Sequence, residues 1–319
     1  MQASDIAASG PAAFQKSRLE AARPRYGERV IYYLLAACAA VSVVTTTAIV
    51  ISLLIPSLEF FGEVSPADFF FGTDWSPTFE PASFGVLPIV VGTLSVTFWS
   101  LLFAIPIGLG AAIYLSEYAG RRTRKVVKPI LEVLAGVPTV AFGFFALAVI
   151  TPAVQSVWPG FLGDGPGIFN VLAGGLAIGL LIVPIIASVS EDAMTAVPGG
   201  LREGAYAMGA TKMKVATRVV FPAALSGIVA SIILAASRAI GETMVVLLAV
   251  GNTPNLTFNP TEAIQAMTAF IATVATGDIG TGTITYKTVF AVALLLFAMT
   301  LVMNLLSIRL VRKYREVYE

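Results

Sequence analysis

Two opposite charges stand four residues apart inside one strongly apolar stretch of the chain. Arg238 and Glu242 interrupt residues 225–250, which otherwise carry mostly apolar and small side chains. On a helix, an i, i+4 spacing directs both side chains from one face. A charge at the centre of a membrane span costs about 2.5–3.5 kcal/mol on insertion scales, so such a pair is retained for a reason. The guanidinium of Arg238 offers a permanently charged, planar fork that matches an oxyanion.

Three interpretations of this pair remain open. The two charges could merely neutralise each other so that the helix inserts, or Arg238 could lie shallow and snorkel to the membrane surface. Easy snorkelling is disfavoured because Arg238 lies 16 residues after Pro222, where the apolar stretch begins. In the functional interpretation Arg238 binds a passing anion, while Glu242 holds the empty fork and discourages other ions. One partly cancelled arginine binds a multiply charged anion weakly, so this interpretation requires a second cation from another subunit.

The composition indicates an all-α integral membrane protein. Of 319 residues, 57% are hydrophobic and 12% are charged, whereas soluble domains carry about 25% charged residues. A bilayer core of about 30 Å needs roughly 20 apolar residues to cross it. Six windows are long enough and predict six transmembrane helices: residues 30–55, 87–115, 130–150, 168–189, 225–250 and 289–310.

The lysines and arginines orient these spans. Of the 20 basic residues, five precede the first span, five lie in residues 121–128, four in 202–218 and four in 309–315. These are alternate connections, and the remaining connections contain Lys287 as their one basic residue beside several acidic ones. Cytoplasmic loops carry an excess of Lys and Arg. The pattern predicts a multi-pass membrane protein with both termini in the cytoplasm.

The predicted spans divide the chain into five parts. These are a cytoplasmic tail (1–29), the first transmembrane helix (30–55), an outer loop (56–86), a core (87–310) with an inner loop at 198–222, and a cytoplasmic tail (311–319). The outer loop is either an ordered cap or a contact for a soluble delivery partner. Residues 261–276 are too short to span and predict a surface or re-entrant helix. The 29-residue polar lead and the long apolar run that follows argue against a removable signal.

Several kinds of chemistry are excluded by residue content. The chain has one cysteine, Cys38, and no histidine, so it lacks a disulfide framework, a His/Cys metal site and a histidine-based triad. It also lacks a GxxxxGK[ST] phosphate cradle, so we expect it to hydrolyse no nucleotide. The few charges within the spans include no nucleophile and base that would suggest a membrane enzyme.

The inner loop reads as two short helices around a turn. Residues 198–200 (Pro-Gly-Gly) open a helix over 201–208, and Gly209 permits the left-handed turn that a side chain resists. Thr211 is a candidate N-cap for a second, basic helix that leads to Pro222. Such a surface suits a groove on a partner protein. The alternative is an amphipathic connector that rests on lipid headgroups.

A proline and glycine pair marks one further position. Residues 135–139 (Ala-Gly-Val-Pro-Thr) could simply allow tight helix packing, or they could break a helix along a polar path at Thr139. The sequence leaves both open.

The order of residues in the inner loop resembles the EAA loop of ABC-transporter permeases. That pattern is EAA, three residues, Gly, nine residues, then I-x-L-P. Glu203, Ala205, Gly209 and Pro222 match it, while Gly204 takes the place of the first Ala and Val and Phe that of Ile and Leu. The resemblance implies that these four residues dock an ATPase subunit.

Three longer stretches resemble PstC-type permeases of phosphate-specific ABC importers. They are SRAIGETM at 237–244, KPILEVLAGVPTVAFG at 128–143, and residues 75–119. This resemblance implies a protein of the bacterial inner membrane with the type I ABC importer permease fold, and a channel shared with a PstA-type sister subunit. It also implies two PstB-type ATPases that bind ATP and Mg, a PstS-type phosphate-binding protein, no cofactor in this chain and no nucleic acid. Arg238 and Glu242 would then line the phosphate path, with Thr139 where the family usually has Ser.

Two other functions fit parts of this pattern. A permease for sulfate or molybdate would share the EAA loop, so residues 237–244 discriminate between the substrates. An anion channel would need no such loop and would conduct without nucleotide.

Overall fold

The computed structural model describes residues 26–163, 165–280 and 282–314. The chain divides into two compact units between Ile51 and Ser52, and each is described by itself. The first unit contains one exposed helical segment, the start of α1 (Tyr26–Glu63). Residues 1–25 and 315–319 of the predicted cytoplasmic tails lie outside the described residues.

The outer loop predicted at residues 56–86 is largely ordered. Helix α1 continues past residue 55 to Glu63. The first eight residues of the predicted outer loop are therefore helical, and the predicted boundary between the first helix and this loop was wrong. After α1 come α2 (Pro66–Phe71) and the antiparallel pair β1 (Trp75–Ser76) and β2 (Ser83–Phe84). Phe60 and Phe69 are fully buried, and their rings meet edge to face at 5.4 Å. These residues form an apolar cap.

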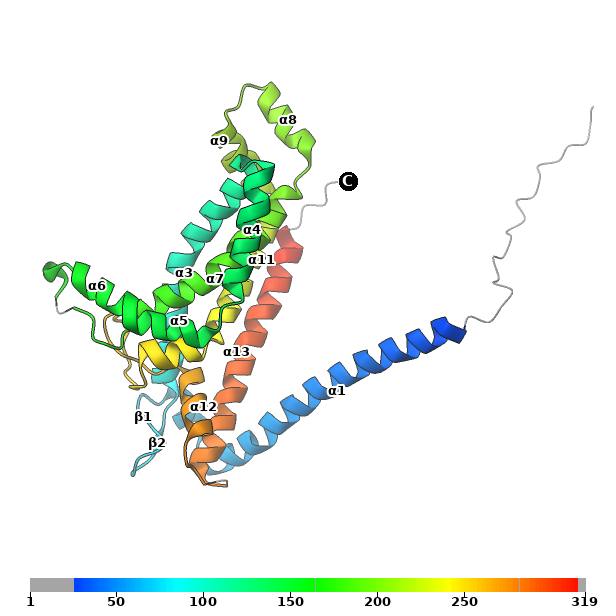
Figure 1. Ribbon diagram of the computed structural model, residues 1–319. Helices are drawn as coiled ribbons and strands as arrows, with labels where there is room; N and C mark the ends of the chain where they lie inside the picture. Colours follow the sequence, from blue (N-terminus) through cyan, green and yellow to red (C-terminus); the bar gives the residue numbers. More distant parts are fainter. Residues whose placement is uncertain (1–25, 164, 281, 315–319) are drawn as a thin grey trace, which may run out of the picture. The chain divides into compact units, whose positions relative to one another are not determined.

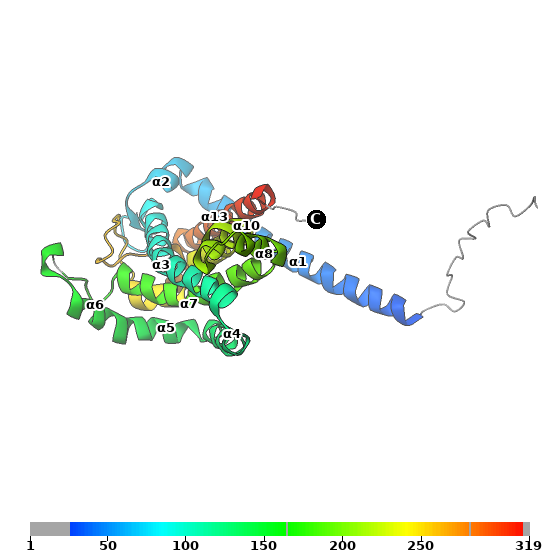
Figure 2. The same ribbon diagram turned by 90° about the horizontal axis from the view of Figure 1, so that it is seen from above.

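Helix α7 (Val171–Thr195) is the centre of the second unit. It is more buried than the other long apolar helices of the described chain, and Figure 2 shows α3 and α5 beside it. A Cβ added at Gly175 would lie 3.0 Å from Trp99 of α3 (Leu87–Ile113), and one at Gly179 would lie 3.1 Å from the Ser100 carbonyl. Small residues let membrane helices approach closely. The glycines therefore set the spacing of the α3–α7 pair, which continues through η1 (Tyr114–Tyr118).

The third span begins later than predicted. Helix α4 (Arg121–Ala135) buries none of its residues and ends before Pro138, because the residue before a proline is driven out of the helical region. The apolar span is α5 (Thr139–Phe145), η2 (Ala146–Ile150) and α6 (Thr151–Val157), followed by η3 (Gly160–Leu162). The boundary at 130–150 was therefore wrong by about half its length. The helix break at residues 136–138 is confirmed.

The fifth span is not one helix over 225–250. A segment made of α9 (Lys212–Val215), η4 (Ala216–Val220) and α10 (Phe221–Ala223) bends by 73° into α11 (Leu225–Ile240). The chain then breaks at residues 241–243 and resumes as a helical segment at 244–250, which contains η5 (Val246–Val250). Counted with this bent pair, the described residues contain six candidate spans, as predicted.

The last two helices complete the bundle. Helix α12 (Met267–Thr276) is shorter than the predicted 261–276 and buries five residues, so it is not a surface helix. Helix α13 (Ile284–Tyr314) is the final span. Figure 1 shows α5 and α6 running across the direction of α13.

Three apolar clusters hold the second unit together. The central cluster joins α3, α5, α7, α11 and η5. At one end, here called the loop end, Met194, Val215, Val220 and Ile228 pack beneath α8 (Gly199–Ala207) and α9. At the opposite end, here called the Trp75 end, α2, Trp75, α12 and α13 pack together. Figure 1 shows α8 and α9 at one end of the unit and β1, β2 and α12 at the other.

Candidate functional site

The helix break at residues 241–243 separates the two charges that the sequence placed on one helix face. Arg238 lies in the last turn of α11, which ends at Ile240, and Glu242 lies inside the break. The expectation of a common helix face was therefore wrong. No ion pair joins Arg238 to Glu242 in residues 26–163, 165–280 and 282–314, so the carboxylate does not hold the fork in this structure.

Glu242 is instead tied to the backbone around the break. Its side chain is buried, and its Oε1 accepts a 3.4 Å hydrogen bond from the Val245 amide at the start of segment 244–250. An acidic side chain is favoured beside the free N–H groups that begin a helix. The Glu242 carbonyl accepts a 2.8 Å bond from Thr268 Oγ1 on α12. The two contacts fix the break against α12.

Arg238 faces away from the core of this chain. Ala235, Ala239 and Ile240 of the same helix are buried, whereas Arg238 is exposed. Next to it, Ser237 Oγ donates a 3.2 Å bond to Asn304 Oδ1 of α13. Within the part of the chain that the structure describes, the guanidinium has no hydrogen-bond or ion-pair partner. Ionisable groups within membrane helices mark functional sites by default, so Arg238 stays a candidate for binding an anion.

Thr139 begins α5 directly after the 136–138 break and is half-buried. Its helix packs tightly on segment 244–250, since a Cβ at Gly143 would lie 3.1 Å from the Met244 carbonyl and 2.8 Å from Leu248. The structure thus brings the helix that starts at Thr139 against the segment that follows Glu242. Among the described residues, no hydrogen bond joins Thr139 to Arg238 or Glu242.

The loop at residues 198–222 folds as two helices around a left-handed turn, as predicted. Gly209 has a φ of +78° and follows α8, where its amide bonds the Tyr206 carbonyl at 2.9 Å. Glu203, Gly209 and Pro222 are exposed, while Ala205 is half-buried against the loop-end cluster. Thr211 takes the N-cap position of α9 but makes no side-chain cap bond.

Arg202 fastens this loop to the bundle. Its guanidinium donates to the carbonyls of Met194 and Val197 at 2.7 and 2.5 Å, at the C-terminal end of α7. The same group lies 3.1 Å from the buried carboxylate of Glu117 in η1. A cation is favoured at a helix C-terminus, where carbonyls are unpaired. Arg202 thereby ties α8 to the end of α7 and to η1.

A second charged cluster at the loop end was missed by the sequence analysis. Glu191 of α7 is buried and accepts Lys128 Nζ at 2.8 Å, and Arg124 Nε lies 3.6 Å away. Lys128 also reaches Asp192 at 2.5 Å. The hydrogen bond that Lys128 donates to Asp192, followed by the one that it donates to Glu191, raises the pKa of Lys128 above its usual value. Two features of the sequence could have indicated this cluster. One is the i, i+4 spacing of Arg124 and Lys128 on α4, and the other is the pair of acidic residues that ends the apolar run of α7.

Exposed apolar side chains mark the outer surface of the same loop. Met208 is 88% exposed, and Tyr206 and Met213 are also exposed. Methionine adapts its shape to a partner surface. Met208 was not among the predicted docking residues, although its place directly before Gly209 puts it at the turn.

Comparison with known proteins extends these observations to most of the chain. Residues 104–316 match the family model for the binding-protein-dependent transport system inner membrane component. The probable ABC transporter permease protein YqgH of Bacillus subtilis is 36% identical over 267 residues, which are 83% of each chain. The phosphate transport system permease protein PstC of Haemophilus influenzae is 32% identical over 84% of this chain and 88% of its own. PstC of Pasteurella multocida is 34% identical over 70% and 74%.

The chain belongs to the inner membrane components of binding-protein-dependent transport systems, and within them to the PstC-type permeases. As a permease it is a multi-pass membrane protein. Solved structures agree on the fold. A bacterial alginate ABC transporter in complex with an alginate pentasaccharide-bound periplasmic protein superposes with a TM-score of 0.59 at 18% identity, covering 91% of this permease and 98% of that chain. The MetNI methionine ABC transporter gives 0.54 at 21% identity, covering 75% and 100%.

Proposed function

We propose that this permease forms one half of the membrane channel of an ATP-driven phosphate importer. The observation that carries the proposal is the unpartnered guanidinium of Arg238 beside a helix break within the bundle. A planar cation is suited to bind an oxyanion bidentately. The PstC relatives support phosphate as that anion.

The exposed side of Arg238 is where the sister subunit, of PstA type, would pack. Phosphate at neutral pH carries more charge than one guanidinium balances, so the sister subunit would supply the second cation. Glu242 contributes negative charge behind the break and discourages a second anion. Thr139, at the start of α5, would offer a hydroxyl to the same path.

The 198–222 loop would dock an ATPase subunit of PstB type. Its exposed Met208 and Tyr206 form an apolar contact surface, and Glu203 lies exposed on the same helix. Closure of two ATPases with ATP and Mg would push α8, and Arg202 would carry the push to the C-terminal end of α7. This chain itself would bind neither nucleotide nor metal.

The orientation follows from the basic loops. Residues 121–128 and 202–218 would lie in the cytoplasm together with both termini, as the positive-inside rule requires. The Trp75 end would then face outward, where a phosphate-binding protein of PstS type delivers its cargo.

Uptake by the reconstituted complex tests the proposal. Proteoliposomes containing this permease, its sister subunit and the ATPases are loaded with ATP and given labelled phosphate, sulfate or molybdate with the binding protein. We expect phosphate uptake that requires both ATP and the binding protein. Uptake of sulfate or molybdate in preference to phosphate would assign another oxyanion. Anion flux through this chain without nucleotide would assign a channel, and either result contradicts the proposal.

A further inference from the structure

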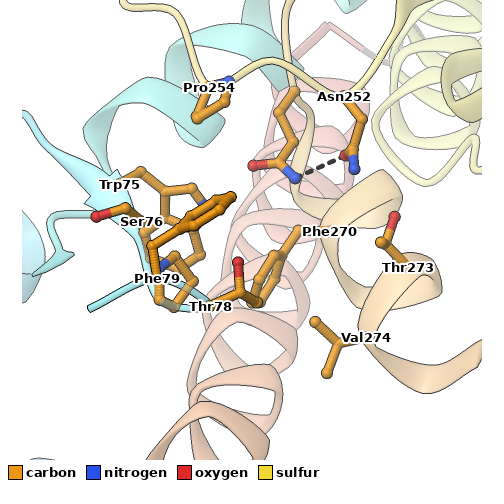
Figure 3. Close-up of a pocket in the computed structure, with 11 residues that line it drawn as sticks. Trp75, Ser76, Thr78, Phe79, Asn252, Pro254, Phe270, Thr273 and Val274 are labelled. Atoms are coloured by element: carbon orange, nitrogen blue, oxygen red, sulfur yellow. Dashed lines mark hydrogen bonds between the residues drawn. The ribbon is translucent and has the colours of Figure 1, made fainter. Parts of the chain in front are cut away.

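The Trp75 end contains a cavity of about 230 Å³ that the proposed transport path does not use. Its walls come from β1 and the residues after it, from the loop after segment 244–250, and from α12 (Figure 3). Aromatic rings of Trp75, Phe79 and Phe270 surround the space, and the amides of Asn252 and Gln265 lie at one side. The lining contains no charged residue.

Two buried polar atoms in these walls have no hydrogen-bond partner. They are Nε1 of Trp75 and Oε1 of Gln265, whose side chains are 4% and 6% exposed. Gln265 Nε2 donates a 2.6 Å bond to Asn252 Oδ1, as the dashed line in Figure 3 marks. If both amides were turned over, Oε1 would gain a partner and Nε2 would lose one. In either arrangement Gln265 keeps one unmatched polar atom, and a buried polar group without a partner is unfavourable.

A neutral carboxamide is the chemical group that fits both atoms. Its carbonyl accepts from the indole N–H of Trp75, which is a donor only. Its NH₂ donates to Gln265 Oε1, or its carbonyl accepts from Nε2 if the amides are turned. A carboxylate or phosphate could not donate, and it would find no cation in these walls. Both atoms are covered but belong to side chains that line the cavity, so an entering amide reaches them when these side chains turn.

A protein is the better source of this carboxamide than a free molecule. Pockets for drug-sized ligands measure about 300–1,000 Å³, whereas this cavity suits a single side chain. Phe79 in its wall is exposed, and so are Leu256 and Phe258 of the loop that also contributes Asn252 and Pro254. These exposed apolar side chains lie on the segments that form the cavity walls, and exposed apolar surface marks protein contacts when it is extensive.

The cavity is joined to the helix break through a closed ring of chain. Asn252 follows segment 244–250, which begins beside Glu242. Gln265 lies three residues before Thr268 in the chain. The bond from Gln265 to Asn252 closes one side of this ring, and the bond from Thr268 to the Glu242 carbonyl closes the other. A group that turns Gln265 therefore acts on the same ring that holds the break.

We infer that this cavity receives an asparagine or glutamine side chain of the soluble protein that docks at the Trp75 end, and that the contact acts on the helix break. The inference rests on the proposed function for the presence of that soluble protein. It adds the site, the chemical group and the route to residues 241–243.

Stimulation of ATP hydrolysis by the soluble partner tests this in the complete complex in nanodiscs. Gln265→Met removes the amide but keeps the side-chain length, and Thr78→Trp fills the cavity mouth without altering either unmatched atom. We expect each to raise the half-saturating concentration of the loaded binding protein about tenfold, the loss of one good hydrogen bond. The matched control is Ala82→Trp, an exposed position on the same hairpin outside the cavity lining, which we expect to leave it unchanged. ATP hydrolysis without partner should be the same in Ala82→Trp as in the unmodified permease.

A double-mutant cycle identifies the group that enters. Asn→Ala and Gln→Ala variants of the binding protein are combined with Gln265→Met. One of them should lose affinity with the unmodified permease and lose nothing further with Gln265→Met.

Unchanged half-saturation in both Gln265→Met and Thr78→Trp would show that the cavity holds only water and would overturn the inference. So would an equal effect of Ala82→Trp, the absence of any coupled amide in the partner, or relief of the defect by free acetamide, which would indicate a small-molecule site. Failure of the proposed function would appear differently, as a lack of phosphate uptake by the unmodified complex.

Discussion

The loop end and the helix break handle charge in opposite ways. At the loop end two buried carboxylates have cationic partners, Glu117 with Arg202 at 3.1 Å and Glu191 with Lys128 at 2.8 Å. At the break, the Glu242 carboxylate accepts a bond from the Val245 amide and has no cationic partner in the described residues, and the nearby Arg238 has no partner there either. Satisfied charges lock elements together, because separating them leaves a charge uncompensated. A guanidinium without a partner is available to bind an incoming anion. This contrast is the basis for proposing force transmission at the loop end and anion binding at the break.

The largest expected effect comes from removing the free charge. Arg238→Ala should lower phosphate uptake at least about 100-fold, the equivalent of two charge-assisted hydrogen bonds, while the complex still assembles. Arg238→Lys keeps the charge and loses the fork, so we expect an intermediate loss. Uptake into proteoliposomes and size-exclusion profiles of the complex measure both.

Glu242→Gln is the control that tests whether Glu242 and Arg238 neutralise each other. Because Glu242 does not contact Arg238 here, Glu242→Gln should neither reproduce nor relieve the defect of Arg238→Ala. Rescue of Arg238→Ala by Glu242→Gln would show that the two side chains neutralise each other, and the contrast with the loop end would fail.

Two neighbouring residues of α8 sharpen the comparison at the loop end. Arg202→Ala leaves the buried Glu117 without its cation and should cost about 3–5 kcal/mol of stability, seen as a lower melting temperature. Glu203 is exposed and has no such contact in the described chain. Glu203→Ala should therefore keep the melting temperature but lower ATPase retention during purification. If both variants melt alike, Arg202 is not the clamp that the structure indicates.

Two glycines of the loop, Gly209 and Gly200, separate the effect of backbone conformation on ATPase docking from the effect of an added side chain. At Gly209, φ is +78°, so Gly209→Val places a side chain in the left-handed region at a cost of about 1–2 kcal/mol. Gly200 lies in α8 with open space around it, so Gly200→Val should be close to neutral. We expect Gly209→Val to release the ATPase and to lose stimulated hydrolysis. Retention of the ATPase by both variants would contradict the docking role of this turn.

The loop shows what sequence reasoning captures well. Gly209 and the two-helix form depend on local chemistry, since left-handed backbone favours glycine, and spans depend on long apolar runs. Both signals lie within a few neighbouring residues. Most of the six spans were predicted for this reason. The third differs because the basic start of α4 and Pro138 shifted the helix onto later residues, and the fifth differs because it is bent and broken.

Features that depend on distant contacts were not predicted. Residues 225–250 look continuously helical because their apolar content does not fall, yet the chain breaks at 241–243, where Thr268 bonds the Glu242 carbonyl from 26 residues away. Glu191 was overlooked because its partners lie 63 and 67 residues before it in the chain. Trp75 and Gln265 line one cavity although their numbers differ by nearly two hundred. A pattern within a few neighbouring residues cannot predict contacts between residues this far apart in the chain.

A smaller effect is expected from the bond that anchors the break. Thr268→Val keeps the shape and removes the hydroxyl, which leaves the Glu242 carbonyl without this partner. The cost is about 1 kcal/mol, and we expect increased amide exchange at residues 241–245. Thr276→Val is the matched control, because the Thr276 hydroxyl bonds its own helix at Ala272. Equal exchange in the two variants would show that α12 does not hold the break.

The smallest effect concerns the pH response of the loop-end cluster. Asp192 and Glu191 raise the pKa of Lys128, so its contribution to stability is fully present below the ordinary lysine pKa of about 10.4 and is lost as pH rises through the higher folded value. The difference in melting temperature between the unmodified permease and Lys128→Met should thus be constant from about pH 6 to 9 and shrink only above about pH 10.5. Arg238 has no acidic partner in the described chain, so Arg238→Met should show no such loss at high pH. A Lys128→Met difference that vanished near neutral pH would mean that Glu191 or Asp192 is protonated there, and the loop end would then be a titratable contact instead of a permanent lock.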